Sequence, residues 1–357
     1  METIKLTIPS DIPHISQIIT GFLILKEQGW KVEIVDRSKD VANPFYDLPV
    51  VLVEYRGKTI VYDLWDGYQN PEGIRKGLDV CDFYFKRSFS AEKNEKLFPD
   101  CLEKIYPLGF NYHLTHKDDP INEPAWKAMI KPLLGRAPDK YFVPEVFEGR
   151  AKEKQGGTVK ILFLTRLWDS KDPAESKEAN EERAFINETR IHIIRTLKER
   201  YGDAFLGGLN DTPVSRELAP ELIVAAKYTE RKKYVQLLHE SDICIGTMGL
   251  HESIGWKTAE YVAAAKAIVN EYFHYSVPGD FREGENYLTF ATAEECIAAV
   301  QKLVEDPALL YHMKKNNEAY YRSYLKPEVL VQNSLKMADR LINTAEKKYL
   351  KKIKNKA

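Results

Sequence analysis

Two glutamates and the short segment between them carry the strongest chemical signal in the sequence. Glu252 and Glu260 are separated by seven residues, in a stretch that follows an apolar run and opens a predicted helix. Ligands of doubly wound sheets bind beyond the carboxyl ends of the strands, where helix N-termini point. The backbone N–H groups of Ser253, Ile254 and Gly255 would stabilise a phosphate there. Eight residues of helix rise about 12 Å, so the two carboxylates could bracket a diphosphate, one at sugar hydroxyls and one at a ribose diol.

A purely structural interpretation of these residues stays open. Glu252 could cap the helix, and Glu260 could pair with Lys257 or Lys266 on its surface. Arg166, at the end of another predicted strand, could form an ordinary surface ion pair. The functional interpretation gains weight because Arg166 and the glutamates all fall at C-terminal strand edges of the same predicted domain.

Other well-known catalytic motifs are absent from the sequence. It contains no GxGxxG, no GxxxxGK[ST] and no GxSxG, which disfavours nicotinamide or flavin dehydrogenases, P-loop enzymes and α/β-hydrolases. No Asp-x-Asp occurs, so a divalent metal held between paired aspartates and a diphosphate is not indicated. The four cysteines form no CxxC pair. We therefore expect neither a metal nor a cofactor.

Strands alternate with helices on both sides of a polar stretch, Glu148–Thr158. Before it, strands are predicted at Ile4–Ile8, Lys31–Val35, Val50–Tyr55, Thr59–Asp63, Asp82–Phe85 and Lys104–Tyr106, with a helix over Ile15–Gln28 and helix N-cap types at Ser10 and Asp11. After it, strands are predicted at Val159–Leu164, Ala204–Leu206, Ile243–Ile245 and Ala267–Val269, with helices that include Glu181–Tyr201 and Lys257–Ala265. This order predicts an α/β fold of two facing Rossmann-like domains.

Length and charge agree with two domains and limit the partners. The chain has 357 residues, with 52 basic and 53 acidic side chains and a net charge of −1, so bulk attraction to nucleic acid is not expected. Its apolar segments are shorter than the ~20 residues that span a bilayer, and the first residues lack the features of a signal peptide. We expect a cytoplasmic protein.

At this point the sequence resembles a known family. Glu252-x7-Glu260 is similar to the acidic signature of group 1, family 4-like retaining glycosyltransferases, which have the GT-B fold. The stretch Phe163-Leu-Thr-Arg-Leu-Trp-Asp-Ser-Lys171 resembles the first strand of that family's donor domain, whose arginine and lysine, five residues apart, hold the nucleotide diphosphate. Tyr234–Ile245 and Glu283–Leu288 also resemble family segments, and the similarity covers most of the second half of the chain.

The resemblance implies transfer of a sugar from a nucleotide-diphosphate sugar to an acceptor hydroxyl, with retention by front-side attack and without a metal. It implies UDP- or GDP-linked donors and a glycan, lipid-linked or small-molecule acceptor, in bacterial-type glycan, glycoconjugate or glycosylated-metabolite synthesis. The domains expected are an acceptor domain over residues 1–152, a donor domain over 153–325, and a helix over 326–357 that packs back on the first domain. The residues implicated are Arg166, Lys171 and Glu252 in catalysis and Thr247, Gly249, Ser253, Ile254, Gly255 and Glu260 in donor binding.

The first half departs from the family pattern. Ser10–His14 stands where the family has a Gly-Gly loop, and Val61–Gly67 stands where it has a histidine that contacts the donor sugar. Asp11, His14, Asp63 and Asp66 are therefore the candidates for the acceptor or sugar side. Two alternatives follow: an inverting transferase that uses Asp63 or Asp66 as general base, and a non-catalytic GT-B-like binding subunit.

The C-terminal end of the chain is rich in lysine. Lys347, Lys348, Lys351, Lys352, Lys354 and Lys356 lie within its last residues. They could form a solvated helix end, where cations suit the helix dipole. They could also attract an anionic membrane surface, such as the inner face of a cell membrane. Both interpretations stay open at this stage.

Overall fold

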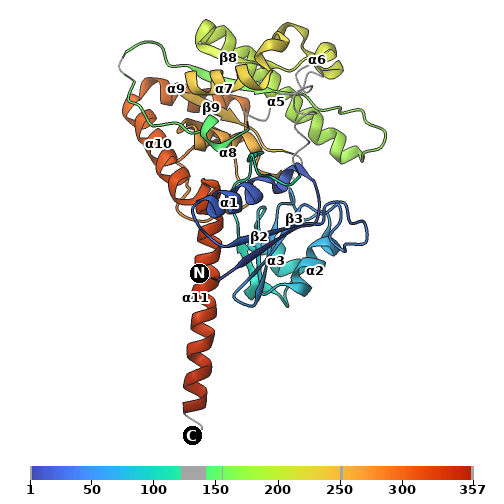
Figure 1. The fold of residues 1–357 in the computed structure, drawn as a ribbon. Helices are drawn as coiled ribbons and strands as arrows, with labels where there is room; N and C mark the ends of the chain where they lie inside the picture. The colour runs from blue at the N-terminus through green and yellow to red at the C-terminus, as the bar shows by residue number, and fades with distance from the viewer. Residues whose placement is uncertain (1, 122–141, 155, 250–251, 355–357) are drawn as a thin grey trace.

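Two α/β units make up the molecule, each built around its own β-sheet (Figure 1). The structure is a computed structural model and describes residues 2–121, 142–154, 156–249 and 252–354, with side chains described as far as residue 347 apart from 345. The fold class predicted from the sequence, α/β with two Rossmann-like units, is confirmed by the topology of the two sheets.

The first sheet has six strands in the order β2-β1-β3-β4-β5-β6. Its strands are β1 (Ile4–Ile8), β2 (Val32–Asp36), β3 (Val50–Tyr55), β4 (Lys58–Asp63), β5 (Phe83–Lys86) and β6 (Ile105–Pro107). The predicted strands Val50–Tyr55 and Thr59–Asp63 form the antiparallel pair β3–β4, and β3 also pairs antiparallel with β1. The remaining pairs are parallel, so the sheet is mixed.

The second sheet has five strands in the order β11-β10-β9-β7-β8, and all its neighbours are parallel. Its strands are β7 (Ile161–Thr165), β8 (Phe205–Leu209), β9 (Ile243–Gly246), β10 (Ala267–Glu271) and β11 (Leu288–Phe290). Every residue of β7 and β9 is buried, as expected for central strands covered on both faces. The carboxyl ends of these two strands therefore lie at one edge of the sheet.

Helices cover the sheets and connect the strands. The first unit contains α1 (Ser16–Glu27), α2 (Pro71–Val80) and α3 (Ala91–Leu97). The second contains α5 (Lys177–Tyr201), α6 (Pro213–Leu218), α7 (Arg231–Glu240), α8 (Trp256–Ala263), α9 (Ala293–Glu305) and α10 (Pro307–Tyr320). A π-helical turn, Tyr321–Leu325, then leads into α11 (Pro327–Lys354).

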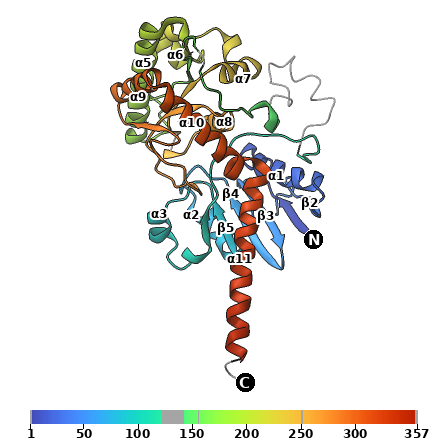
Figure 2. The same ribbon diagram turned by 90° about the vertical axis from the view of Figure 1, so that its left-hand side faces the viewer.

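The last helix returns to the first unit, as predicted. Leu330, Val331 and Leu335 of α11 belong to the same buried core as Phe22 of α1. At the crossing point, a Cβ atom on Gly21 would overlap the carbonyl oxygen of Pro327, so only glycine lets the two helices approach this closely. The second half of α11 projects from the body of the molecule (Figure 2).

Two local expectations were wrong. Ser10 and Asp11 do not cap a helix, because α1 begins at Ser16 after a short 3-10 turn, and the Ser10 hydroxyl donates instead to the Leu48 carbonyl. The helical rise expected between Glu252 and Glu260 was also wrong, because the helix predicted over Lys257–Ala265 begins at Trp256, after Glu252. Within the described residues, no helix is long and apolar enough to cross a membrane.

Candidate functional site

A pocket of about 390 Å³ opens at the carboxyl ends of β7 and β9. Arg166 follows β7, Thr247 follows β9, and the first turn of α8 forms the facing wall. Gly246 permits this close packing, because a Cβ atom there would overlap the side-chain oxygen of Asn270 on β10. The pocket lies at the edge of the sheet where a doubly wound fold binds its ligand.

Positive charge dominates this pocket. Its lining includes four cationic side chains and a single carboxylate, that of Glu260. Arg231 pairs with Glu260 at 2.8 Å. The other three cations, Arg166, Arg190 and Lys257, form no ion pair with any carboxylate of the described residues. Arg166 is exposed, but Arg190 is buried and Lys257 is half-buried. Because such charges are costly without a partner, the pocket is suited to an anion.

Arg190 is the most deeply buried of these cations, with 4% of its surface exposed. Its guanidinium donates to the Arg166 carbonyl at 2.7 Å and to the Thr247 hydroxyl at 2.8 Å, so it joins the ends of β7 and β9. Its Nε atom is buried without a hydrogen-bond partner. Burial lowers the pKa of Arg190 to about 10, and the charge of Arg166 acts in the same direction while that of Glu271 opposes them. The group still carries its charge at neutral pH.

Lys257 occupies the first turn of α8. Its ammonium group donates to the Leu164 carbonyl on β7, which holds it over the pocket floor. Burial lowers the pKa of Lys257 to about 8, and the neighbouring arginines act in the same direction while Glu260 opposes them. The two helices α5 and α8 thus each bring one cation to the same pocket.

Glu260 lies on the buried face of α8, with 3% of its surface exposed. One carboxylate oxygen accepts from Arg231 at 2.8 Å and the other from the Tyr234 hydroxyl at 2.5 Å. Each carboxylate oxygen has a second acceptor position. The side chain can therefore accept further hydroxyl hydrogen bonds from a ligand while Arg231 and Tyr234 hold it in place.

Glu252 is at the junction between the two units and does not line the pocket. Its backbone is left-handed, with φ of 61°, so it stands in a loop and not on the helix that carries Glu260. Its carboxylate accepts from Lys93 of α3 at 2.9 Å and lies 3.5 Å from a ring nitrogen of His274. The hydrogen bond from Lys93 lowers the pKa of Glu252. The expected helical spacing between the two glutamates was wrong for this reason.

The other residues predicted on the donor side divide into two groups. Arg166, Thr247, Gly249 and Gly255 line the pocket, together with Glu260. Ser253 and Ile254 do not line it, and their carbonyls accept from Gly249 and Arg87 respectively. Because Gly255 is the residue before the first turn of α8, the free amides at the pocket are those that start the helix.

Lys171 does not reach the pocket. Its side chain is 75% exposed and pairs with Glu217 of α6 at 2.7 Å. The Asp169 carboxylate accepts from the Lys171 amide at 2.9 Å in a tight local turn. The predicted arginine–lysine pair is thus not brought together, and Arg190 and Lys257 contribute the additional charge.

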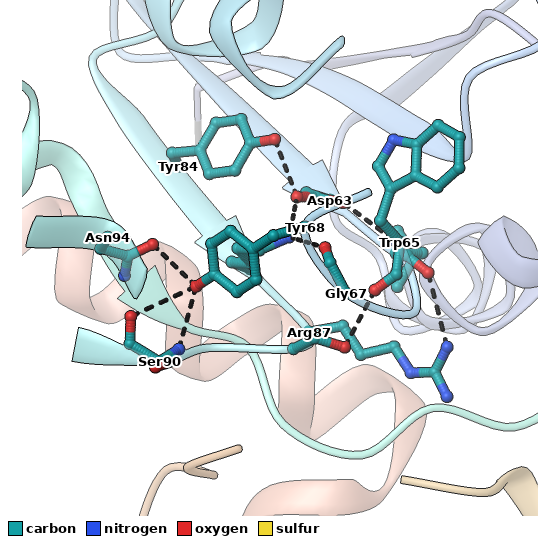
Figure 3. Close-up of polar contacts among 11 residues, drawn as sticks. Asp63, Trp65, Gly67, Tyr68, Tyr84, Arg87, Ser90 and Asn94 are labelled. Carbon is teal, nitrogen blue, oxygen red and sulfur yellow. Dashed lines mark hydrogen bonds and ion pairs between the residues drawn. The ribbon is translucent and has the colours of Figure 1, made fainter. Parts of the chain in front are cut away.

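On the first unit, Asp63 belongs to a buried network and not to an open acceptor site. Asp63 and Lys86 are both fully buried and form an ion pair of 2.7 Å at the ends of β4 and β5. The Tyr84 hydroxyl donates to the same Asp63 oxygen at 2.8 Å, and the Trp65 amide donates to the other (Figure 3). Both oxygens are engaged, so the structure does not support Asp63 as a general base.

Asp66 and His14 are brought together, as expected for residues on one side of a site. A His14 ring nitrogen lies 3.7 Å from the Asp66 carboxylate, and the His14 ring packs against Trp256, which lines the pocket. Burial would raise the pKa of Asp66, but contacts with His14 and Arg87 outweigh it and lower the pKa to about 2. Asp11 is exposed in the loop before α1.

Arg87 links this cluster to the second unit. It pairs with Asp66 and donates to the Ile254 carbonyl at 2.7 Å, with only 4% of its side chain exposed. The loop that precedes α8 is therefore fixed from across the domain junction.

Sequence reasoning missed Arg190, Lys257 and Arg231. A signal for Arg190 was present, because Arg183, Asn187 and Arg190 continue the buried stripe formed by Ile194 and Leu197 on α5. Polar residues on an otherwise apolar helical face indicate a site. Arg231 carries no comparable pattern, since a short helix rich in basic residues is usually a solvated one.

One group of possible metal ligands occurs in the part of the chain that the structure describes. Glu27, His116 and Asp118 each offer an atom within 4.8 Å of the others. Lys117 pairs with both Glu27 and Asp118, which offsets their negative charge. None of these residues lines the pocket described above.

Comparisons with known proteins give a limited result. No family model and no curated protein matches the chain. Among solved structures, it is similar to Anabaena HepE in complex with UDP-glucose, at 11% identity over 94% of this chain and 98% of that one, with a TM-score of 0.43. It is also similar to the C-terminal domain of a group 1 glycosyl transferase, LpcC from Francisella tularensis, at 14% identity over 51% and 97%, with a TM-score of 0.35. Sucrose-phosphate synthase from Thermosynechococcus elongatus matches at 12% identity over 92% of each chain, with a TM-score of 0.35. With TM-scores this low, the function has to be argued from the residues of the pocket.

Proposed function

We propose that this chain is a glycosyltransferase that moves a sugar from a nucleotide-diphosphate sugar to an acceptor hydroxyl. The observation that carries the proposal is the pocket with three cations, Arg166, Arg190 and Lys257, that have no carboxylate partner among the described residues. A diphosphate supplies the missing negative charge, and a sugar ester of it is a substrate whose bond cleavage develops more charge at that place. The donor would bind to the second unit, and the acceptor would approach from the first.

The chemistry proposed is electrostatic stabilisation of the leaving diphosphate. The guanidinium of Arg190 is held by backbone carbonyl and hydroxyl oxygens, so it needs no reorganisation as charge develops. Free amides at the start of α8 add the positive end of the helix dipole. Glu260 would accept hydrogen bonds from the ribose, and Glu252 would orient hydroxyls of the donor sugar.

We further propose that the side-chain cations neutralise the diphosphate leaving group, the role that a divalent metal ion has in other sugar transfers. Activity should then survive EDTA, because the diphosphate charge is already compensated by protein groups. Complete loss of activity with EDTA, restored by Mg²⁺ or Mn²⁺, would contradict this part of the proposal.

Retention is the stereochemical outcome we propose. An inverting reaction needs a base for the acceptor hydroxyl. Asp66 is poorly suited to that role, since its pKa of about 2 makes it a weak proton acceptor. NMR of the first-formed product reports its anomeric configuration. An inverted product would contradict retention and would make Asp66 and its neighbour His14 candidates for the general base.

The main experiment is a calorimetric panel of UDP, GDP, TDP, CDP and ADP against the full chain, with UDP and GDP expected to bind. Arg166→Ala should weaken binding by about tenfold or more, because a charge-assisted hydrogen bond is worth roughly 1.5–3 kcal/mol. Binding by none of the five would refute the donor site. Tight binding without hydrolysis or transfer of any matching nucleotide sugar would favour the non-catalytic binding subunit instead.

We also propose a weak contact of the C-terminal end with an anionic membrane surface. The second half of α11 projects from the body (Figure 1), and Lys347, Lys348, Lys351, Lys352 and Lys354 lie on it. Lys356 lies outside the described residues. Each lysine near anionic lipid contributes on the order of 1 kcal/mol. Co-sedimentation should be seen with phosphatidylglycerol vesicles and lost with purely phosphatidylcholine ones or in high salt; equal binding to both would contradict a charge-driven contact.

A further inference from the structure

Lys257 has no counterpart among the residues that the sequence implicated in catalysis. Its ammonium group lines the pocket and donates to the Leu164 carbonyl, a neutral acceptor that leaves its charge uncompensated. Its charged and titratable neighbours come from four segments: Glu260 on α8, Arg231 and Tyr234 on α7, Arg190 on α5, and Arg166 after β7. The only carboxylate among them already pairs with Arg231 at 2.8 Å.

Lys171 offers a direct comparison within the same chain. It is three-quarters exposed, its ammonium group pairs with Glu217 at 2.7 Å, and it lies outside the pocket lining. An exposed lysine with a carboxylate partner gains little from a new anion, because it would exchange one solvated contact for another. A lysine that already lies in the pocket without a counter-charge gains a full charge-assisted interaction.

We propose that the ammonium group of Lys257, together with the buried guanidinium of Arg190, binds the donor diphosphate, and that Lys171 does not. The inference rests on the proposed function and assigns the anion-binding residues of that site. The ligand class is a diphosphate, either free pyrophosphate or the diphosphate of a nucleotide.

The assignment predicts a pH dependence near pH 8 that the arginines of the pocket do not produce. Burial and the nearby arginines lower the pKa of Lys257 to about 8, so an increasing share of the free protein carries a neutral amine above that pH. Only the ammonium form attracts the anion, so the affinity for diphosphate should fall as the pH rises through 8. Below that pH, binding should be insensitive to this group. Pyrophosphate loses its last proton near the upper end of this window, and so does the uracil ring of UDP. The contribution of Lys257 is therefore the difference between the wild type and Lys257→Arg, in which the ligand titrates identically.

The experiment measures the dissociation constants of pyrophosphate and UDP by calorimetry at pH 7.0 and pH 9.5, for the full chain and four variants. Relative to Lys257→Arg, the wild type should lose about tenfold or more in affinity between pH 7.0 and pH 9.5, because most of the amine is then neutral. Lys257→Met should bind about tenfold more weakly than the wild type at pH 7.0 and should share the smaller pH dependence of Lys257→Arg. Lys171→Gln should match the wild type at both pH values, and Lys171→Met serves as its matched apolar control.

The number of protons taken up on binding UDP distinguishes a loss of the Lys257 charge from a loss of folded protein. Titrations at pH 8.5 in two buffers with different ionisation enthalpies should show that the wild type takes up protons on binding UDP and that Lys257→Arg takes up fewer. If Lys257→Met fails to fold, the wild type and Lys257→Arg still decide the question.

The possible failures are distinguishable. A wild type that binds neither pyrophosphate nor UDP at pH 7.0 refutes the proposed function itself. A wild type that binds both ligands, but with the same pH profile as Lys257→Arg, overturns the assignment of Lys257 while leaving the donor site intact. Loss of binding in Lys171→Gln with normal binding in Lys257→Met would overturn it as well, and would return Lys171 to the role that the sequence predicted.

Discussion

Arg190 shows what a single side chain can indicate about a binding site. Its guanidinium is nearly fully buried, has one nitrogen without a partner, and forms no ion pair within the described residues. An isolated buried charge reduces stability unless it is compensated. A bound anion beside the ends of β7 and β9 would compensate the charge of this guanidinium and so offset the cost of its burial. Glu260 and Glu252, by contrast, already have protein partners, and their roles have to be separated by experiment.

The first prediction concerns Glu260. Glu260→Gln should weaken UDP binding by about tenfold, because the carboxylate that would hold the ribose loses its charge, and tenfold corresponds to about 1.4 kcal/mol. Pyrophosphate binding should not weaken, since it has no ribose and the pocket loses one negative charge. Calorimetry with both ligands measures the difference. Equal weakening of both ligands would mean that Glu260 acts only by holding Arg231 in place.

The second prediction concerns Glu252. Glu252→Gln should lower kcat strongly with a modest change in donor KM, because contacts to the reacting sugar can strengthen as charge develops on the ring. Steady-state kinetics with varied donor measures both constants. Lys93→Met is the control, since it removes the ion pair across the junction but keeps the carboxylate. If Lys93→Met reproduces the whole effect on kcat, Glu252 serves only as a link between the units.

At the scale of elements, the second sheet was the easiest part to predict. Runs such as Ile161–Leu164 and Ile243–Ile245 are apolar throughout because both faces are covered, and their short length distinguishes them from a buried helix. The strand ends therefore located Arg166 and Thr247 correctly at the pocket. The loops that follow strands were harder, because tight turns such as that at Asp169–Lys171 depend on local hydrogen bonds that periodicity does not report.

The conformation of the acidic motif was also mispredicted, because it depends on contacts that the sequence pattern does not report. Its spacing suggested one continuous helix, but the left-handed backbone at Glu252 places that residue outside α8. The position is fixed by contacts with Lys93 and by the hydrogen bond from Arg87 to the adjoining loop, both from the other unit. Contacts between residues more than 150 positions apart in the chain cannot be read from the spacing of one segment.

The third prediction tests the network at the ends of β4 and β5. Asp63→Asn should lower the free energy of unfolding by about 3–5 kcal/mol, because it leaves the buried Lys86 ammonium without its carboxylate. Urea denaturation followed by circular dichroism measures this. Asp66→Asn is the matched control, with a partly exposed carboxylate and an expected loss that is clearly smaller. Unchanged stability of Asp63→Asn, with loss of activity, would instead support the alternative of Asp63 as a base.

At the scale of the whole molecule, the two units are held together at several separate places. Arg87 donates to the Ile254 carbonyl, Lys93 pairs with Glu252, and Phe89 forms a β-bridge with Ser276. The chain itself also crosses back, through the π-helical turn into α11 (Figure 2). Motion of one unit against the other would therefore break contacts that touch Glu252 and the loop before α8, which couples domain arrangement to the donor side of the pocket.

The final prediction separates the two halves of α11. The first half contributes Leu330, Val331 and Leu335 to the core of the first unit, and burying one such side chain stabilises by roughly 1.5–3 kcal/mol. A chain that ends at residue 325 should therefore lose cooperative unfolding of the first unit, measured by thermal melting followed by circular dichroism. A chain that ends at residue 344 keeps the core contacts of Leu330, Val331 and Leu335 and should melt within a few degrees of the full chain. A loss of about 1 kcal/mol shifts the melting temperature by roughly 2–4 °C in a domain of this size. The chain that ends at residue 344 should also keep its affinity for UDP, since the pocket lies wholly in the second unit. A large drop in melting temperature for the chain ending at 344 would show that the projecting half of α11 contributes to the fold, which its position outside the body does not predict.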